Sequence, residues 1–215
     1  MSGLRERKKQ QTRQLIADTA RELFAERGFE AVTVTDIARA AEVSPQTVFN
    51  YFPTKEDLFY SRLEAIETGM VDAVRNREPG ESVLAAFARF ILDLQGPMDD
   101  TEQLRTVTRV ITESPALLAR ERQVLDHYAS ALAAAIAEET GDDTVVPLVT
   151  AYALIGLHRS LIEHVRRRVA DGASASEIAR SVRAEAERGI ALLERGLGGQ
   201  DAVPDAHDGV EDRVA

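Results

Sequence analysis

The sequence predicts an all-α fold, with a small three-helix unit at the N-terminus and a larger helical unit after it. Three observations support this prediction. Alanine, the strongest helix former, occurs 32 times among the 215 residues. Apolar residues recur with the period of a helix along most of the chain. No segment alternates convincingly with the period of two that a half-buried β-strand requires.

The first expected helix, over 12–27, has a recognisable apolar face and a recognisable end. The apolar face consists of Ile16, Ala20, Leu23 and Phe24. Gly28 ends the helix, because glycine readily takes the left-handed conformation that follows a C-cap. Phe29 then lies where it can fold back onto Phe24, which is the apolar contact typical of this ending.

Two short helices follow, and capping residues precede each of them. Thr33 and Asp36 have the spacing of a capping box, while Ser44 and Pro45 suit an N-cap and the first helical position. We expect the short helices over 34–41 and 45–51, joined by Glu42-Val43-Ser44. Their lengths are those of a helix-turn-helix, in which the second helix enters the major groove of DNA.

The rest of the chain reads as longer helices separated by proline and glycine. We expect these helices over 54–77, 82–95, 101–114, 115–140, 144–170 and 174–196. Residues 198–215 have no periodicity, and we expect them to lack regular structure. The run Arg166-Arg167-Arg168 is interpreted as a solvated helix end, where cations complement the helix dipole.

The net charge of −10 conceals a difference between the two ends of the chain. Residues 1–55 carry a balance of +2, and residues 56–215 carry a balance of −12. The first 13 residues contain five basic side chains and one acidic side chain. One end can therefore meet a polyanion that the rest of the chain repels.

Several function classes are excluded by what the sequence lacks. Without cysteine there are no disulfides, thiolate metal sites or cysteine nucleophiles. The histidines form no metal-ligand pattern, and no P-loop, GxGxxG, GxSxG or HExxH motif occurs, so we expect no metal, no cofactor and no enzyme. No apolar stretch follows the basic N-terminus, and no apolar run approaches the ~20 residues of a membrane helix. We therefore expect a cytoplasmic protein without a membrane partner.

The second short helix carries side chains suited to reading DNA. Its outward positions bear no charge: Pro45, Gln46, Thr47, Phe49, Asn50 and Tyr51. Gln46 and Asn50 can each pair with adenine through two hydrogen bonds. Hydroxyl or ammonium groups that can hold phosphates lie at both ends of the helix, on Ser44, Thr47, Tyr51 and Lys55. Short helices with a tight turn also occur in all-α domains that bind no DNA.

A family resemblance is carried by residues 12–59, which read TRQLIADTARELFAERGFEAVTVTDIARAAEVSPQTVFNYFPTKEDLF. The matching positions keep one uninterrupted register: Ala20, Leu23, Phe24, Gly28-Phe29, Thr33-Val34, Asp36-Ile37-Ala38, Ala41-Glu42-Val43-Ser44, Thr47-Val48-Phe49, Tyr51-Phe52 and Lys55-Glu56-Asp57-Leu58. This segment resembles the DNA-binding region of the tetracycline-repressor (TetR) family of bacterial regulators. The remainder agrees with that family in length, helicity and helix count.

The resemblance implies roles for individual residues. Backbone-contacting positions of the family match Thr33, Ser44, Thr47, Tyr51 and Lys55. Positions that can face bases match Thr35, Pro45, Gln46 and Asn50. A tyrosine is common where Phe49 stands, so a hydroxyl contact with phosphate is missing here. Lys-Gly is common where Pro45-Gln46 stands, so the operator should differ from those of Lys-Gly members.

One further departure concerns the turn between the two short helices. A glycine is common in the family where Glu42 stands. This turn must therefore either use a conformation open to any residue or accept left-handed geometry at some cost.

The resemblance also implies that the larger unit binds a ligand and forms dimers. Apolar residues of the last two helices suit a four-helix interface with a second copy: Val149, Tyr152, Ala153, Ile155 and Gly156, with Ile178, Val182, Ala186, Ile190 and Leu193. Residues that can line a ligand cavity are Met70, Phe87, Phe90, His127, Tyr128, Tyr152 and His158. Both patterns also fit ordinary core helices.

The sequence is thus identified as a member of the TetR family. The expected parts are a basic arm at 1–11, a helix-turn-helix DNA-binding domain at 12–55, a ligand-binding and dimerisation domain at 56–197 and a tail at 198–215. We expect a repressor that binds a palindromic double-stranded DNA operator as a homodimer and is released by a small-molecule effector. The alternatives are an architectural DNA-binding protein without ligand control, which the acidic larger unit disfavours, and a helical enzyme with a carboxylate acid–base site.

Overall fold

A computed structural model describes residues 2–61, 63–94 and 100–196. Every regular element of these residues is a helix, which confirms the predicted all-α fold. The helices are α1 (Ser2–Arg27), α2 (Val34–Ala40), α3 (Pro45–Tyr51), α4 (Lys55–Phe59), α5 (Leu63–Arg75), α6 (Val83–Leu94), α7 (Thr101–Thr112), α8 (Pro115–Thr140), α9 (Val146–Ala170) and α10 (Ala175–Arg195). No helix in the described ranges is long and apolar enough to cross a membrane. The predicted tail at 198–215 lies outside the described residues.

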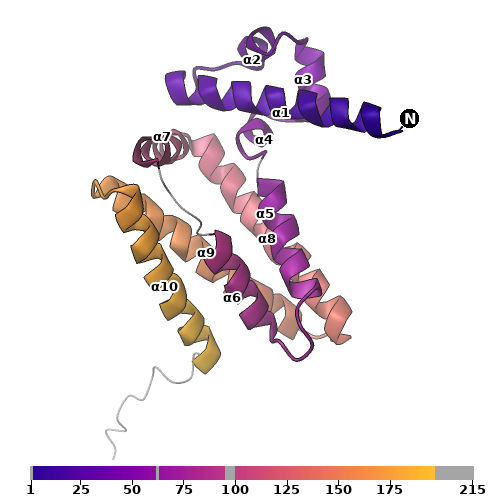
Figure 1. Cartoon of the computed structure of the whole chain (residues 1–215), viewed down its shortest axis with the longest axis vertical. Helices are drawn as coiled ribbons and strands as arrows, with labels where there is room; N and C mark the ends of the chain where they lie inside the picture. Colours follow the sequence, from indigo (N-terminus) through magenta and orange to yellow (C-terminus); the bar gives the residue numbers. More distant parts are fainter. Residues whose placement is uncertain (1, 62, 95–99, 197–215) are drawn as a thin grey trace, which may run out of the picture.

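The molecule has two parts, which we call the head (α1–α4) and the body (α5–α10) (Figure 1). In the head, α1 packs against α2 and α4, and α2 packs against α3. In the body, α5 packs on α8, α8 on α9, α9 on α10, α10 on α6, and α6 returns to α5. Each part has its own cluster of buried apolar side chains.

The two cores meet at the corner between α7 and α8. Val110 of α7 and Leu117 of α8 are buried among the apolar side chains of the head, not among those of the body. Ser114, in the turn between these helices, is 1% exposed. The head therefore completes its core only in contact with the body.

The ends of the first helices follow the local signals in the sequence. Gly28 has a φ of +80°, and the ring centroids of Phe24 and Phe29 lie 4.9 Å apart, as predicted. Thr33 and Asp36 form the predicted capping box. Hydrogen bonds from the Thr33 side chain and backbone hold the pKa of Asp36 below its usual range.

The basic arm at 1–11 is not separate from the first helix. Helix α1 extends back to Ser2, so residues 2–11 are helical and the predicted start at residue 12 is wrong. The segment is rich in Arg, Lys and Gln, which have high helix propensity and can extend a helix without packing partners. Lys8, Lys9 and Gln10 are exposed on this extension.

The single helix predicted over 54–77 is also wrong, because the chain leaves the helix at Tyr60 and forms α4 and α5. The Tyr60 side chain is buried, and its hydroxyl donates a hydrogen bond to the Leu117 carbonyl at 3.0 Å. Burial, with a smaller contribution from Glu121, raises the pKa of Tyr60 well above its usual value. The break between α4 and α5 therefore coincides with a hydrogen bond to a residue 57 positions away in the sequence.

The arginine run of α9 is not the uniformly solvated end that was predicted. The Arg166 side chain is 12% exposed and forms ion pairs with Glu121 of α8 and with Glu163 of its own helix. Arg167 is exposed, whereas Arg168 is half-buried. The helical period turns Arg166 toward α8, where its ion pair joins the two longest helices of the body.

Candidate nucleic-acid interface

Apolar side chains and one strained residue hold the helix-turn-helix in shape. Ile37, Ala38 and Val48 are each at most 1% exposed in the core of the head. The Val43 amide donates to the Ala38 carbonyl at 2.9 Å and closes the turn. Glu42 has a φ of +55°, so the turn accepts left-handed geometry, which costs about 1–2 kcal/mol for a residue with a side chain.

Helix α3 begins at the predicted cap. The Thr47 amide donates to Ser44 Oγ at 3.0 Å, and the two hydroxyls of Ser44 and Thr47 lie 2.8 Å apart in a second hydrogen bond. Pro45 occupies the first helical turn. These contacts fix the direction of α3 and keep both hydroxyls together at its start.

The outward face of α3 is exposed and uncharged. Pro45, Gln46 and Asn50 are exposed, and Phe49 keeps 47% of its surface open. Gln46 Nε2 donates to Asn50 Oδ1 at 3.1 Å, so the two amides lie side by side. The structure thus brings three of the four predicted base-facing residues onto one surface, while Thr35 is exposed on the neighbouring α2.

The Lys55 ammonium makes hydrogen bonds inside the head that the sequence did not predict. Its Nζ donates to the carbonyls of Phe29 at 2.9 Å and Val32 at 3.1 Å, and it lies 4.1 Å from the Phe29 ring centroid. An ammonium group has three donors, so one remains for a phosphate. Of the other predicted phosphate contacts, Thr33 is exposed and Tyr51 is half-buried.

Polar contacts between the head and the body escaped the sequence prediction. Ser114 Oγ donates to Glu30 Oε1 at 2.6 Å, and Arg120 Nη2 pairs with Asp57 Oδ1 at 2.7 Å. These partners are 84 and 63 residues apart in sequence, so no local pattern could have revealed them. They join the loop after α1 and helix α4 of the head to the turn before α8 and the first turns of α8.

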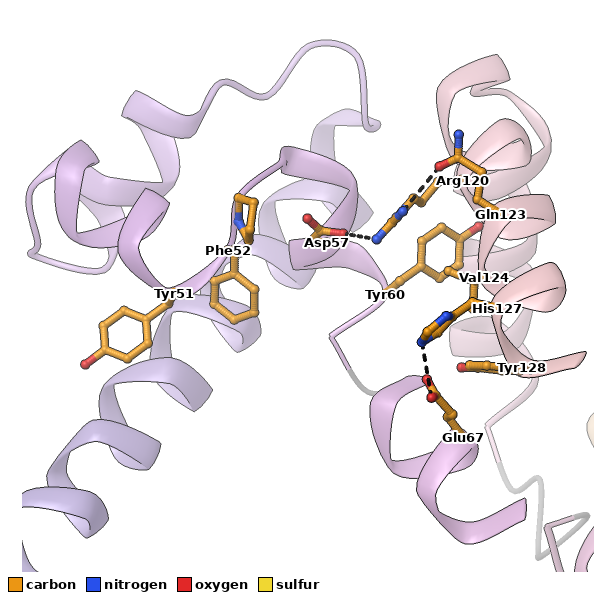
Figure 2. A pocket seen from close by; sticks show the side chains of 11 residues that line it. Tyr51, Phe52, Asp57, Tyr60, Glu67, Arg120, Gln123, Val124, His127 and Tyr128 are labelled. Carbon is orange, nitrogen blue, oxygen red and sulfur yellow. Dashed lines mark hydrogen bonds and ion pairs between the residues drawn. The ribbon is translucent and has the colours of Figure 1, made fainter. Parts of the chain in front are cut away.

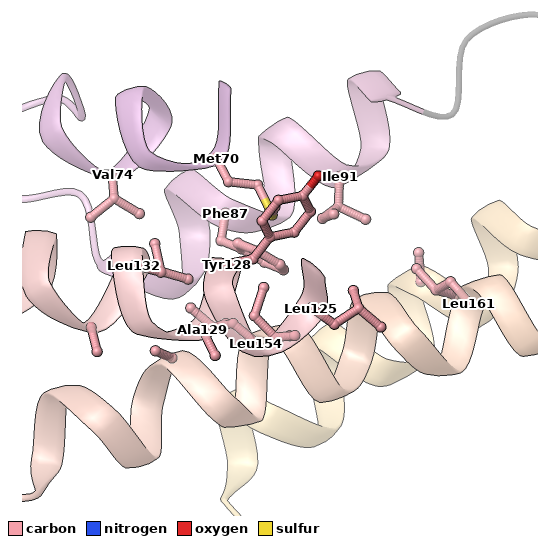
Figure 3. Close-up of a cluster of buried hydrophobic side chains, with 14 of the residues drawn as sticks. Met70, Val74, Phe87, Ile91, Leu125, Tyr128, Ala129, Leu132, Leu154 and Leu161 are labelled. Atoms are coloured by element: carbon pink, nitrogen blue, oxygen red, sulfur yellow. The ribbon is translucent and has the colours of Figure 1, made fainter. Parts of the chain in front are cut away.

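The residues predicted to line a ligand cavity are distributed over separate sites in the described structure. Met70, Phe87 and Tyr128 lie in the packed core of the body (Figure 3). Phe90 is half-buried at the edge of that core, whereas Tyr152 is 48% exposed on α9. The helical spacing that suggested a cavity lining therefore reflects core packing for most of these residues.

His158, also predicted to line a cavity, is buried on α9 with 8% of its surface exposed. Its Nδ1 is buried and has no hydrogen-bond partner among the described residues. Burial lowers the pKa of His158 to about 4. The imidazole is therefore neutral near pH 7.

The apolar faces predicted for dimer contact divide into two groups. Ile155, Ile178, Val182 and Ala186 are packed in the core of their own chain and leave almost no surface for a second copy, whereas Val149 and Tyr152 of the same prediction are exposed. Val149 and Tyr152 lie with Val145, Val146 and Leu148 in a group of exposed large apolar side chains at the start of α9. The burial pattern thus separates one open apolar surface from the chain's own core.

The fold of the head and the exposed α3 surface are those of a helix-turn-helix domain. Residues 16–61 match the family model described as bacterial regulatory proteins of the TetR family, and residues 77–196 match the MftR C-terminal domain. This chain belongs to the TetR family of transcriptional regulators, and like its relatives it is a regulator and not an enzyme.

Two curated regulators and one solved structure illustrate the similarity. The HTH-type transcriptional regulator TcmR of Streptomyces glaucescens is 32% identical over 148 residues, which are 66% of each chain. The putative mycofactocin biosynthesis regulator MftR of Mycobacterium tuberculosis is 30% identical over 74% of this chain and 81% of its own. The Thermus thermophilus repressor FadR, solved with lauroyl-CoA, has a TM-score of 0.51 and 25% identity, with 86% of this chain and 94% of that chain covered.

Proposed function

We propose that this chain is a ligand-responsive repressor that binds a palindromic operator as a homodimer and leaves it when a small molecule binds the body. The outward face of α3 carries the proposal, because uncharged amide side chains suit base edges better than phosphates. Regulators of the TetR family generally bind DNA as repressors and often respond to ligands.

In this proposal residues 12–55 read the operator, assisted by the basic segment before them, and residues 56–197 bind the effector and the second copy. The open apolar surface at the start of α9 favours dimer formation, because a large apolar patch rarely stays in water. Two-fold symmetry places the two α3 helices about one DNA turn, ~34 Å, apart, so the operator is palindromic.

Release follows from a shift between two arrangements of the dimer. The effector binds an arrangement in which the spacing of the α3 helices no longer fits the operator. To take operator-competent dimers from 99% to 1%, the effector must prefer that arrangement by about 10⁴-fold, or ~5.5 kcal/mol. The lauroyl-CoA complex of FadR supports a small organic effector for this fold.

The proposal is tested by fluorescence anisotropy on DNA from beside the chain's own gene, with capture of genomic fragments to find other sites. We expect salt-sensitive binding that is at least about 10³-fold tighter at a palindromic site than on random DNA. Equal binding to all DNA would support the architectural alternative. Absence of any specific site in the genome would contradict the proposal.

A further inference from the structure

A cleft of about 510 Å³ lies at the joint between the head and the body (Figure 2). Its walls come from the end of α3, from α4 and α5, and from one face of α8. Its volume falls in the range of small-molecule sites. Its wall includes His127 and Tyr128, both of which were predicted to line a ligand cavity, and Tyr128 also belongs to the packed cluster that holds Met70 and Phe87.

The charged side chains of the cleft leave one carboxylate uncompensated. Arg120 and Asp57 neutralise each other at 2.7 Å. Glu67 Oε1 lies 3.2 Å from His127 Nε2, and the His127 side chain is 68% exposed on the rim. A neutral imidazole donates a hydrogen bond to Glu67 but does not cancel its charge. Glu67 is therefore the carboxylate of the cleft lining that no arginine or lysine of the lining neutralises.

Aromatic side chains form much of the remaining lining. Phe52, Tyr60 and Tyr128 are 2%, 8% and 4% exposed, so their positions are fixed by packing. Tyr51, at the end of α3, is half-buried and completes this part of the wall. Aromatic rings attract cations through their quadrupoles, most strongly where water is excluded. The Arg13 guanidinium already lies 4.9 Å from the Phe52 ring centroid, so the aromatic surface left for a ligand cation in the cleft is that of Tyr51, Tyr60 and Tyr128.

We propose that this cleft binds an organic monocation with an aromatic or apolar body, whose charge lies at Glu67. The ligand would contact Tyr51 of α3 and the Asp57–Arg120 pair, and so act on the joint that sets the direction of α3. The claim that this cation is the effector rests on the proposed function. The claim that the cleft binds the cation does not, because binding can be measured without DNA.

The binding test uses tetraphenylphosphonium, a permanent monocation with an aromatic body, titrated calorimetrically into the full chain without DNA. We expect about one site per chain, and Glu67→Gln should weaken binding about tenfold or more, because it removes a charge-assisted contact but keeps an acceptor for His127. The matched control is Asp126→Asn. It makes the same charge change on an exposed position of α8 outside the cleft lining, and should alter affinity less than about twofold.

Triphenylphosphine oxide provides the ligand control, since it keeps the aromatic body and lacks the net charge. It should bind at least about tenfold more weakly than the cation, because it forms no charge-assisted contact with Glu67. No binding of tetraphenylphosphonium, equal weakening by the two substitutions, or equal affinity for the two compounds would each overturn the proposed site.

Operator affinity is measured separately, with and without tetraphenylphosphonium. The cation should lower operator affinity of the wild type and have a smaller effect on Glu67→Gln. If the cation binds at Glu67 but no operator exists, the proposed function fails and the site stands. If the operator is bound but Glu67→Gln leaves cation binding unchanged, the site fails and the proposed function stands.

Discussion

The head and the body are both helical, but different interactions fix their helices. Helices α2, α3 and α4 have only seven, seven and five residues, and each begins at a side-chain cap, on Thr33, Ser44 and Thr54. Helices α8 and α9 have 26 and 25 residues, and α9 begins without a side-chain cap. Short helices do not form alone in water. Side-chain caps also begin α7, α8 and α10 in the body. The difference is one of length, because each short head helix depends on its cap and a few buried side chains, whereas the long body helices also bury extended apolar faces.

The largest expected effect tests whether the head depends on the body for its core. Leu117→Ala changes a residue of α8 that is fully buried among head side chains. It should lower the free energy of unfolding by about 2–5 kcal/mol through lost burial and a cavity. Urea unfolding measures this, with half-buried Leu118→Ala as the control. Equal losses in the two variants would contradict a shared core.

The next effect concerns the body and pH. Folded His158 has a pKa of about 4, below its unfolded value of 6.5, so the unfolded chain takes up a proton first as the pH falls. The buried neutral His158 therefore adds about 3 kcal/mol to the free energy of unfolding above about pH 6.5. This addition is lost as the pH falls toward 4. Urea unfolding at pH 7.5 and 4.5 should therefore give a smaller pH-dependent loss for His158→Phe than for the wild type. Identical losses would refute this role.

A matched pair of caps compares the two parts directly. Ser44→Ala removes the cap of α3, and Ser174→Ala removes the cap of α10. Each should cost about 1 kcal/mol of unfolding free energy. Only Ser44→Ala should also weaken operator binding, because only α3 carries the proposed reading surface. If the two variants bound the operator with similar affinity, the prediction that only the cap of α3 affects DNA binding would be contradicted.

The smallest expected effect lies in the turn of the head. Glu42→Gly relieves the left-handed strain at φ +55° but increases the freedom of the unfolded chain. The balance should raise the free energy of unfolding by about 0.5 kcal/mol. Thermal or urea unfolding measures it, and a destabilised variant would mean that the Glu42 side chain contributes more than its strain costs.

Features with local causes could be predicted from the sequence. Gly28 ends α1, Ser44 caps α3, and the helix expected over 115–140 is Pro115–Thr140 in the structure. Each depends on residues within a turn or two of one another. The candidate reading surface was predictable for the same reason, because Gln46 and Asn50 are one helical turn apart.

Features with distant causes were not predictable. The break at Tyr60 accompanies a hydrogen bond to Leu117, and the burial of Arg166 depends on Glu121 of another helix. Apolar periodicity on α10 also could not distinguish a face turned to the chain's own core from one turned to a second copy. Only the packing shows that Ile178 belongs to the core.

The central claim, that α3 reads base sequence, is tested most directly by comparing wild type and Gln46→Ala on operator DNA and on random DNA of equal length. Anisotropy titrations at one fixed salt concentration should show operator binding weakened by about 1–3 kcal/mol, with binding to random DNA unchanged. An equal loss on both DNAs would show that Gln46 does not read a base and would contradict the claim.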